Sequence, residues 1–378
     1  MAECIFCGKR DKLISSTLKV CRDCILSKEW DKIKPHLLSI HAKIRKEEGL
    51  APYAPKDNDS EINFSCNLCV NECSLSSNST SYCGLRNLTK DESGELPIPS
   101  KKKAYIHGYT DENPTNCCNS WFCPAGTSKG YPKFSVKKGP EYGTYSYAAF
   151  FYGCSFNCLF CQNPTHKNIH KRRLRDIKSI VKEIVENKKI TCVCYFGGTP
   201  EPQLPFTIEL SELILKKIDK KRIIRFCWEW NGSGNPQYIK QAMEIALKSG
   251  GNIKFDLKTF DKRLSYALSG QNNKRTLENF KFLGEKYFGA RKNLPEMSGC
   301  TLLVPGYTMI EDIEEIAKFI ASVNKNIPYS LLVFHPDYYM QDLPYTSKKH
   351  AYRCLEVAEK HLKNVHLGNQ FLLAFSKQ

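Results

Sequence analysis

The sequence has no apolar run long enough to cross a lipid bilayer, so we expect no membrane-spanning helix. Its first residues, Met1-Ala-Glu-Cys-Ile-Phe-Cys, lack the basic and then apolar pattern of a secretory signal. We therefore expect a cytoplasmic protein without membrane contact. Thiols stay reduced in that compartment, and the 19 cysteines among 378 residues consequently predict metal sites rather than disulfides.

Acidic residues are scarce relative to basic ones. The chain has 39 Asp and Glu against 56 Lys and Arg, which gives a formal net charge of +17 at pH 7. Such an excess is typical of a protein with an acidic partner, either a protein surface or a nucleic acid. A solvated, Lys-rich surface explains the same excess. We favour an acidic protein surface as partner, because a nucleic-acid-binding module would leave the motifs described below unexplained.

Three cysteines form the motif around which the rest of the chain is arranged. Cys154, Cys158 and Cys161 are spaced C-x3-C-x2-C, and the apolar run and glycine before them predict a loop just past a strand. Thiolates at this spacing can hold three irons of a four-iron, four-sulfur cluster. The fourth iron keeps an open position, which is typical of a metal site that reacts. A zinc knuckle or three buried thiols are the alternatives from spacing alone.

This motif, with the aromatic Phe160 before the last cysteine, resembles the cluster loop of the radical S-adenosylmethionine (radical SAM) superfamily. The resemblance implies a [4Fe-4S] cluster whose open iron binds the amino and carboxyl groups of SAM. One electron from the cluster then cleaves the sulfonium to give a 5′-deoxyadenosyl radical. The protein supplies binding, orientation and exclusion of water. An electron donor such as a ferredoxin or flavodoxin is implied as well.

Strands and helices alternate from residue 148 onward, which indicates a parallel α/β fold. We expect a helix capped by Asp176, and strands at 148–152, 191–196, 223–228, 253–257, 300–304 and 330–334. Six parallel strands suit the partial (β/α)6 barrel of radical SAM enzymes, with its active site at the C-terminal strand ends. The chain then divides into a zinc-ribbon-like module with a helix (1–55), a cysteine-rich connecting module (56–145) and the barrel (146–378).

Motifs at the predicted strand ends resemble SAM-binding segments of the AmmeMemoRadiSam and glycyl-radical-activating-enzyme-like branch. The run from Gly197 to Glu201 resembles its G-G-E-P loop, although Thr199 stands where the family has Glu. Later segments, an Asn-Gly and an Asp-Leu-Lys, also match in order. The resemblance implies that the cofactor is bound by Phe160, Gly197, Gly198, Glu201, Asn231, Asp256 and Lys258. The strand-end residues His335 and Tyr307 are catalytic candidates, with an ordinary structural role as the alternative for each.

Two sets of four cysteines precede the barrel. The first consists of two C-x2-C pairs, which predict the two knuckles of a tetrahedral structural zinc site, formed by Cys4, Cys7, Cys21 and Cys24. A nucleic-acid-binding ribbon is its alternative. The second predicts another structural zinc, with an auxiliary iron–sulfur cluster as the alternative, at Cys66, Cys69, Cys73 and Cys83.

A third, looser group of cysteines lies in a segment rich in Gly, Asn and Pro at about 111–143. We expect this segment to be an irregular loop over the active face. Its members are Cys117, Cys118 and Cys123, for which free thiols and a metal role are both open.

The expected function is hydrogen abstraction from a protein or peptide by a radical SAM enzyme. Post-translational C-methylation is the first interpretation, since the cysteine- and lysine-rich chain resembles the archaeal glutamine methyltransferase that acts on methyl-coenzyme M reductase. Methylation of an unreactive carbon calls for a donor such as methylcobalamin, yet the sequence lacks the Asp-x-His-x-x-Gly cobalamin signature. Glycyl-radical activation is the alternative, although the paired C-x2-C-x2-C insert is absent. Peptide or tRNA modification is a further one.

Overall fold

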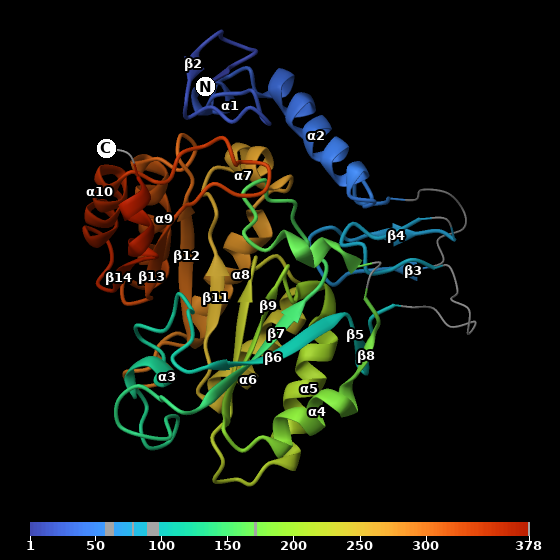
Figure 1. Ribbon diagram of the computed structural model, residues 1–378, viewed down its shortest axis with the longest axis vertical. Coiled ribbons are helices and arrows are strands. Elements are labelled where there is room, and N and C mark those ends of the chain that lie inside the picture. Colours follow the sequence, from blue (N-terminus) through green and yellow to red (C-terminus); the bar gives the residue numbers. More distant parts are fainter. Residues whose placement is uncertain (57–63, 78, 89–97, 170–171, 377–378) are drawn as a thin grey trace.

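The computed structural model describes residues 1–56, 64–77, 79–88, 98–169 and 172–376 (Figure 1). Its main sheet contains β6 (Ile106–Glu112), β7 (Tyr145–Phe151), β9 (Ile190–Gly197), β10 (Arg225–Trp230), β11 (Ile253–Asp256), β12 (Met297–Leu303), β13 (Tyr329–Val333) and β14 (Val365–Gly368). The spatial order is β14-β13-β12-β11-β10-β9-β7-β6. Neighbours from β7 to β14 are parallel, whereas β6 is antiparallel to β7. The predicted α/β class is confirmed, with more strands than the six expected.

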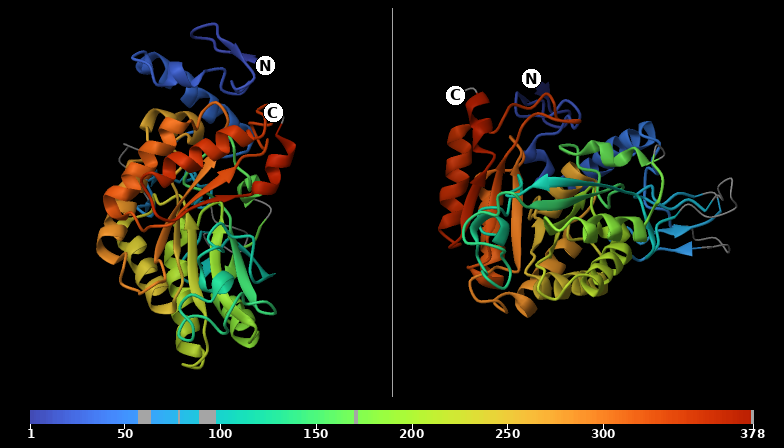
Figure 2. Two further views of the ribbon diagram at one scale, coloured as in Figure 1. Left: turned by 90° about the vertical axis from the view of Figure 1, so that its left-hand side faces the viewer. Right: turned by 60° about the horizontal axis from the view of Figure 1, so that its bottom comes forward.

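Helices cover the outer face of this sheet (Figure 1, Figure 2). They are α4 (Ile177–Glu186), α5 (Leu204–Lys217), α6 (Pro236–Ser249), α8 (Lys274–Tyr287), α9 (Ile310–Asn324) and α10 (Lys348–Glu359). In β9, Val193 and Tyr195 pack in the core that these helices share, whereas Cys194 and Phe196 face inward. The Asp176 carboxylate accepts the Lys178 N–H at 2.7 Å and so caps α4 as predicted.

The inner face of the sheet surrounds a cavity of about 870 Å³. Every strand of the sheet contributes to its lining, including Tyr109, Ser146, Cys194, Glu229, Lys254, Cys300, Leu332 and His366. A flat sheet could not surround one space in this way, so the sheet is curved. Within the described residues β14 and β6 are edge strands that do not pair with each other, and the barrel is therefore open.

The segment between β6 and β7, at 113–144, contains the short α3 (Pro124–Thr127). It contacts the first residues of the parallel strands: Asn113 Nδ2 donates to Thr191 Oγ1 at 3.1 Å, and Glu141 pairs with Arg225 at 2.6 Å. The segment therefore covers the N-terminal strand ends, and the expectation of a loop over the active face is wrong. Its first part, at 115–121, still reaches the cavity from that side.

The N-terminal module lies beyond the opposite end of the barrel (Figure 1). It contains β1 (Ala2–Glu3), β2 (Arg10–Asp11), α1 (Arg22–Ile25) and α2 (Trp30–Glu47). Leu18 and Val20 belong to one apolar cluster with Phe160 and Phe334 of the barrel. The module is therefore packed directly on the end where the parallel strands finish.

The remaining elements are short. β3 (Phe64–Ser65) pairs with β4 (Ser74–Leu75), and β5 (Lys103–Ala104) pairs with β8 (Arg175–Asp176). Helix α7 (Lys262–Ser269) follows β11, and 3-10 helices lie at Pro164–Lys167, Glu201–Gln203 and Gln370–Phe375. None of the helices in the described part of the chain is long and apolar enough to cross a membrane.

Candidate active site

The loop after β7 carries the three-cysteine motif. Gly153 begins it at φ +81°, where a side chain would press against Leu85 at 2.7 Å. Backbone hydrogen bonds tie the loop to α7, from Asn157 N to Ser269 O at 2.9 Å and from Leu159 N to Leu268 O at 3.0 Å. The thiols of the motif all line the cavity, namely Cys154, Cys158 and Cys161.

The environment of these thiols fits a three-cysteine iron–sulfur cluster. Burial, and then the charge of nearby Cys158, raises the pKa of Cys154 and of Cys161 to about 12. Metal binding would displace the protons of Cys154 and Cys161 and so stabilise them as thiolates. Two buried nitrogens that line the same cavity, Gln162 Nε2 and His166 Nδ1, have no protein partner among the described residues. The donor set and the space beside it therefore suit a bound cluster with a further ligand.

The glycines at the end of β9 border the cluster loop. Gly197 has φ +116°, and a Cβ on Gly198 would lie 2.2 Å from Gly153 O and 2.7 Å from the His166 ring. Cys154 Sγ lies 3.6 Å from Gly198 O. Both glycines line the cavity, so their lack of side chains keeps room beside the cluster position.

Asn231 and Glu201 lie on either side of Ser155. Asn231 Nδ2 donates to Cys154 Sγ at 3.3 Å and to Ser155 Oγ at 3.1 Å, and Asn231 lines the cavity. Glu201 is fully buried and does not line it, which corrects its assignment as a cofactor contact. Its carboxylate instead accepts from Ser155 Oγ at 2.7 Å and from Ser233 Oγ at 2.9 Å. Glu201 thereby ties the cluster loop to the turn after β10.

An ionic chain runs along β10 and β11 into the cavity. Lys254 Nζ lies 3.0 Å from Glu229 Oε2 and 2.9 Å from Asp256 Oδ1, and Lys258 Nζ lies 3.0 Å from Asp256 Oδ2. Burial alone would raise the pKa of Asp256, but the two lysines outweigh it and the pKa lies well below its usual value. Asp256 is therefore ionised at neutral pH, between two cations.

Asp256 and Lys258 are among the cofactor-binding residues predicted from the sequence, whereas Glu229 and Lys254 are not. The signal that could have found them is strand periodicity, since Lys254 is two residues before Asp256 and shares its face. Polar residues at alternating positions of two adjacent strands in a barrel indicate that this face of the strands lines a polar cavity.

The two catalytic candidates lie in different places. His335 lines the cavity, and its Nδ1 is 3.3 Å from Pro336 O. Tyr307 is fully buried outside the cavity: its hydroxyl accepts from Ser15 N and donates to Val20 O, both at 3.0 Å. The expectation that Tyr307 faces the substrate is therefore wrong, because its hydroxyl joins the N-terminal module to the barrel. Phe160 lines the cavity and also packs under that module.

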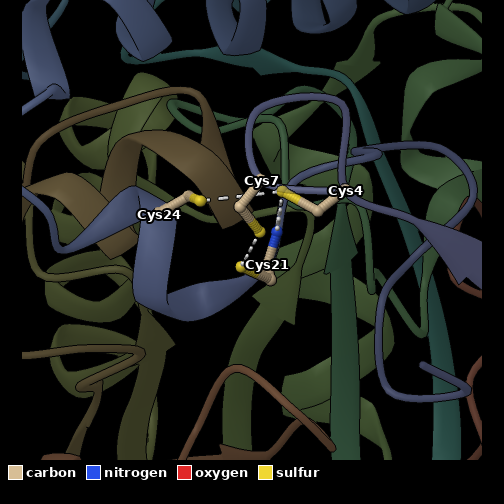
Figure 3. Close-up of side chains that lie close together, drawn as sticks. All are labelled: Cys4, Cys7, Cys21 and Cys24. Atoms are coloured by element: carbon tan, nitrogen blue, oxygen red, sulfur yellow. Dashed lines mark hydrogen bonds between the residues drawn. The ribbon is translucent and has the colours of Figure 1, made fainter. Parts of the chain in front are cut away.

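The first set of four cysteines forms a compact group in the N-terminal module (Figure 3). The sulfurs of Cys4 and Cys24 are 3.7 Å apart, as are those of Cys7 and Cys21, and all four lie within 4.8 Å of one another. This geometry is compatible with a tetrahedral metal site.

The second set is buried but less compact. Its four thiols, Cys66, Cys69, Cys73 and Cys83, are buried and influence one another electrostatically. They are not among the groups of the described residues whose donor atoms all lie within 4.8 Å of one another. Metal binding there stays a prediction.

Residues 149–320 match the family model described as Radical SAM superfamily. The barrel is therefore a radical SAM domain, and the chain is a radical SAM enzyme of that superfamily. Within it, the chain is 26% identical over 221 residues to a putative glycyl-radical enzyme activating enzyme of Methanocaldococcus jannaschii. That match covers 58% of this chain and 79% of the relative, and the predicted activating-enzyme-like branch is confirmed. The family implies a [4Fe-4S] cluster and SAM.

Likeness to solved structures is remote. SuiB of Streptococcus suis bound to the precursor peptide SuiA is 18% identical with a TM-score of 0.41, over 60% of this chain and 49% of that chain. The present chain thus spans about half the length of SuiB. A domain of pyruvate-formate lyase-activating enzyme from Bacteroides vulgatus is 17% identical with a TM-score of 0.37, over 47% of this chain and 98% of that one.

Proposed function

We propose that this radical SAM enzyme abstracts hydrogen from a protein or peptide substrate. The observation that carries the proposal is that the three motif thiols, the Gly197–Gly198 turn and ionised Asp256 surround one cavity of about 870 Å³. A space of this size accommodates a cofactor and a segment of a larger substrate. The Methanocaldococcus jannaschii relative is named as an enzyme that activates another enzyme, which agrees with a macromolecular substrate.

The residues have separable roles in this proposal. The cluster, when bound, supplies the electron that splits SAM into methionine and a 5′-deoxyadenosyl radical. Cys154, Cys158 and Cys161 hold it, and Asn231 fixes the first of these thiols. Asp256 offers a negative charge to polar hydrogens of the cofactor, since Lys254 and Lys258 keep it ionised. The surrounding barrel excludes water from the reacting atoms.

The substrate would enter at the rim near the C-terminal 3-10 helix. Asn369, Phe371 and Leu372 line the cavity there, and Phe371 is 66% exposed. An exposed aromatic at a cavity mouth suits an apolar side chain of a peptide. The net charge of +17 favours an acidic surface on the substrate or on an electron donor such as a ferredoxin or flavodoxin.

Glycyl-radical activation is the reaction that the relative favours. The finer expectation, cobalamin-dependent C-methylation of a glutamine in methyl-coenzyme M reductase, has no observation in its favour and stays a prediction. Likewise, a structural zinc ion at Cys4, Cys7, Cys21 and Cys24 is supported by their compact geometry and by the small size of the module around them.

The test is anaerobic purification and reconstitution with iron and sulfide, followed by reaction with SAM and a reductant. We expect a cluster-containing protein that forms 5′-deoxyadenosine, and no product from a variant with alanine at 154, 158 and 161. Cys354→Ala is the matched control, because this buried thiol lies in α10 outside the cavity. Failure of the fully reconstituted wild type to form the product would refute the proposal.

A further inference from the structure

A second group of metal-type donor atoms lies in the same cavity, on the side formed by the segment between β6 and β7. The sulfurs of Cys117 and Cys118 and a carboxylate oxygen of Glu229 all lie within 4.8 Å of one another. Cys117 Sγ and Cys194 Sγ both contact Glu229 Oε1, at 3.1 and 3.5 Å. Cys118 and Cys300 line the same cavity. Several soft donors therefore converge on one carboxylate oxygen inside the barrel.

Hydrogen bonds to the barrel hold the adjacent cysteines in place. Ser330 Oγ donates to Cys118 O at 2.9 Å, and Trp121 Nε1 donates to the same hydroxyl at 3.1 Å. Asn119 Nδ2 donates to Asn252 Oδ1 at 2.8 Å. The backbone N–H of Asn119 points at Cys117 Sγ at 3.4 Å, a contact that would stabilise a thiolate. The two donors are thus preorganised rather than carried on a free loop.

Lys254 orients the carboxylate of Glu229. Its ammonium lies 3.0 Å from Oε2, so Oε1 is the oxygen left to face the thiols. A partner of this kind fixes one oxygen of a carboxylate ligand and leaves the other for a metal. The same lysine also contacts Asp256 at 2.9 Å and so joins this group to the wall of the SAM cavity.

A divalent cation would balance the charges of this group. If the cation displaced both thiol protons, Cys117, Cys118, Glu229 and Asp256 would carry four negative charges, against two positive charges on Lys254 and Lys258. Uncompensated charge is costly inside a protein, and a dication removes it.

We propose that Cys117, Cys118 and Glu229 bind a thiophilic divalent cation of the zinc type. In a tetrahedral site with metal–sulfur bonds of about 2.3 Å, the ligand atoms lie roughly 3.8 Å apart, which small side-chain rotations achieve here. Two sulfurs and one carboxylate oxygen match zinc or ferrous iron rather than magnesium or calcium. Three protein ligands leave a fourth position directed at the cavity, open to a water molecule or to Cys300. These three ligands are distinct from the cluster cysteines, although both sets line the same cavity.

The first experiment uses unaltered protein and zinc as the probe. Full-length reconstituted protein is alkylated under native conditions with and without added zinc, and each cysteine is read out by peptide mass spectrometry. We expect zinc to slow alkylation of Cys117 and Cys118 by about tenfold or more. Cys123, a partly exposed thiol of the same segment that does not line the cavity, serves as the internal control, whose alkylation zinc leaves unchanged. Equal alkylation of Cys117 and Cys118 in both samples overturns the proposal.

The second experiment counts metal. We expect Cys117→Ser/Cys118→Ser to contain one divalent metal ion fewer per chain than wild type, with equal sulfide, and Cys354→Ser to match wild type. Glu229→Gln keeps both thiols but loses the anionic oxygen, so its zinc affinity falls by about tenfold or more. Loading with cobalt(II) adds a check, since the double variant loses the sulfur-to-cobalt absorption of one site. Unchanged metal content in the double variant overturns the proposal, and none of these measurements depends on SAM cleavage.

Discussion

The cluster loop and the N-terminal module both present cysteines, three in one place and four in the other. Those of the cluster loop lie on the wall of a cavity of about 870 Å³, which is also lined by residues whose buried nitrogens have no partner in the described part of the chain. Those of the module lie within 4.8 Å of one another and line no part of that cavity. A set of three leaves a coordination position for a reacting ligand, whereas a set of four closes it. Ligand number and access, rather than cysteine content, thus separate a reactive metal site from a structural one.

The two regions are also joined. Lys167 Nζ donates to Asn157 Oδ1 of the cluster loop at 2.6 Å and pairs with Glu48, just after α2, at 2.7 Å. His41 of α2 contacts the amide of the same Asn157 at 2.9 Å. The N-terminal module, which contains the four-cysteine site, therefore helps to position the cluster loop.

Loss of one thiol from the three-cysteine motif should have the largest effect on activity. In Cys161→Ala the cluster would keep two protein ligands, so we expect 5′-deoxyadenosine formation to fall by about a thousandfold or more. The free energy of unfolding should change little, because this side chain faces the cavity. The measurements are product per chain by chromatography and chemical denaturation. A wild-type rate in this variant would place the cluster elsewhere.

Loss of two thiols from the four-cysteine group of the N-terminal module should lower stability rather than activity. Cys4→Ser/Cys24→Ser removes half of the ligands, and a structural metal contributes directly to folding, so we expect the free energy of unfolding to fall by about 3 kcal/mol or more. Iron and sulfide per chain should stay at the wild-type level. Denaturation curves with metal analysis check this. Parallel loss of zinc and cluster iron would mean that the two sites are not separable.

Much of the barrel could be predicted, because its parallel strands are apolar runs separated by amphipathic helices. The buried face of α9, for example, includes Ile313, Ile316, Ala317 and Ile320, which recur at helical spacing. The edge strand β6 was not predicted. Its sequence, Ile-His-Gly-Tyr-Thr-Asp-Glu, is largely polar and exposed, and such a strand forms only because β7 offers a partner.

The site was predicted where a motif determines local geometry and missed where long-range packing does. The cluster cysteines, Asn231 and Asp256 do line the cavity. Tyr307 and Glu201 do not, because each satisfies buried backbone or hydroxyl groups from a distant segment, which no local pattern reveals. The segment predicted at about 111–143 was assigned to the wrong end of the barrel for the same reason, since its buried Glu141–Arg225 pair is a tertiary contact.

Gly198→Ala should have an intermediate effect and sharpens the description of the open site. The added Cβ would overlap Gly153 O, so the glycine turn or the cluster loop must shift. We expect SAM affinity to fall by about tenfold or more, because displaced backbone loses its contacts with the ligand. Isothermal titration of reconstituted protein measures it. Gly139→Ala is the control: its φ of +87° strains an alanine, but a Cβ there meets nothing within 4 Å, so backbone strain is tested without a clash at the cluster loop. Equal affinities in both variants would contradict the role given to Gly198.

The smallest effect concerns the connection between the two regions. His41 is buried, its Nε2 lies 3.0 Å from Ala267 O, and its Nδ1 faces the Asn157 amide. Burial lowers the pKa of His41 to about 4, so the folded protein holds the neutral ring. The unfolded chain, with a pKa near 6.5, binds a proton first as the pH falls, and stability is lost below that value.

We therefore expect a contribution from His41 that is complete above about pH 6.5 and shrinks by about 2 kcal/mol by about pH 5. His166, whose pKa burial lowers to about 3, adds a loss of the same sign. Burial also lowers the pKa of His350 and of His366, so His41→Gln should remove only the contribution of His41, about 2 kcal/mol by about pH 5, because the amide does not titrate. His107→Gln, an exposed position on β6, should leave it intact. An unchanged pH dependence in His41→Gln would show that the contact between α2 and the cluster loop is not held by a neutral imidazole.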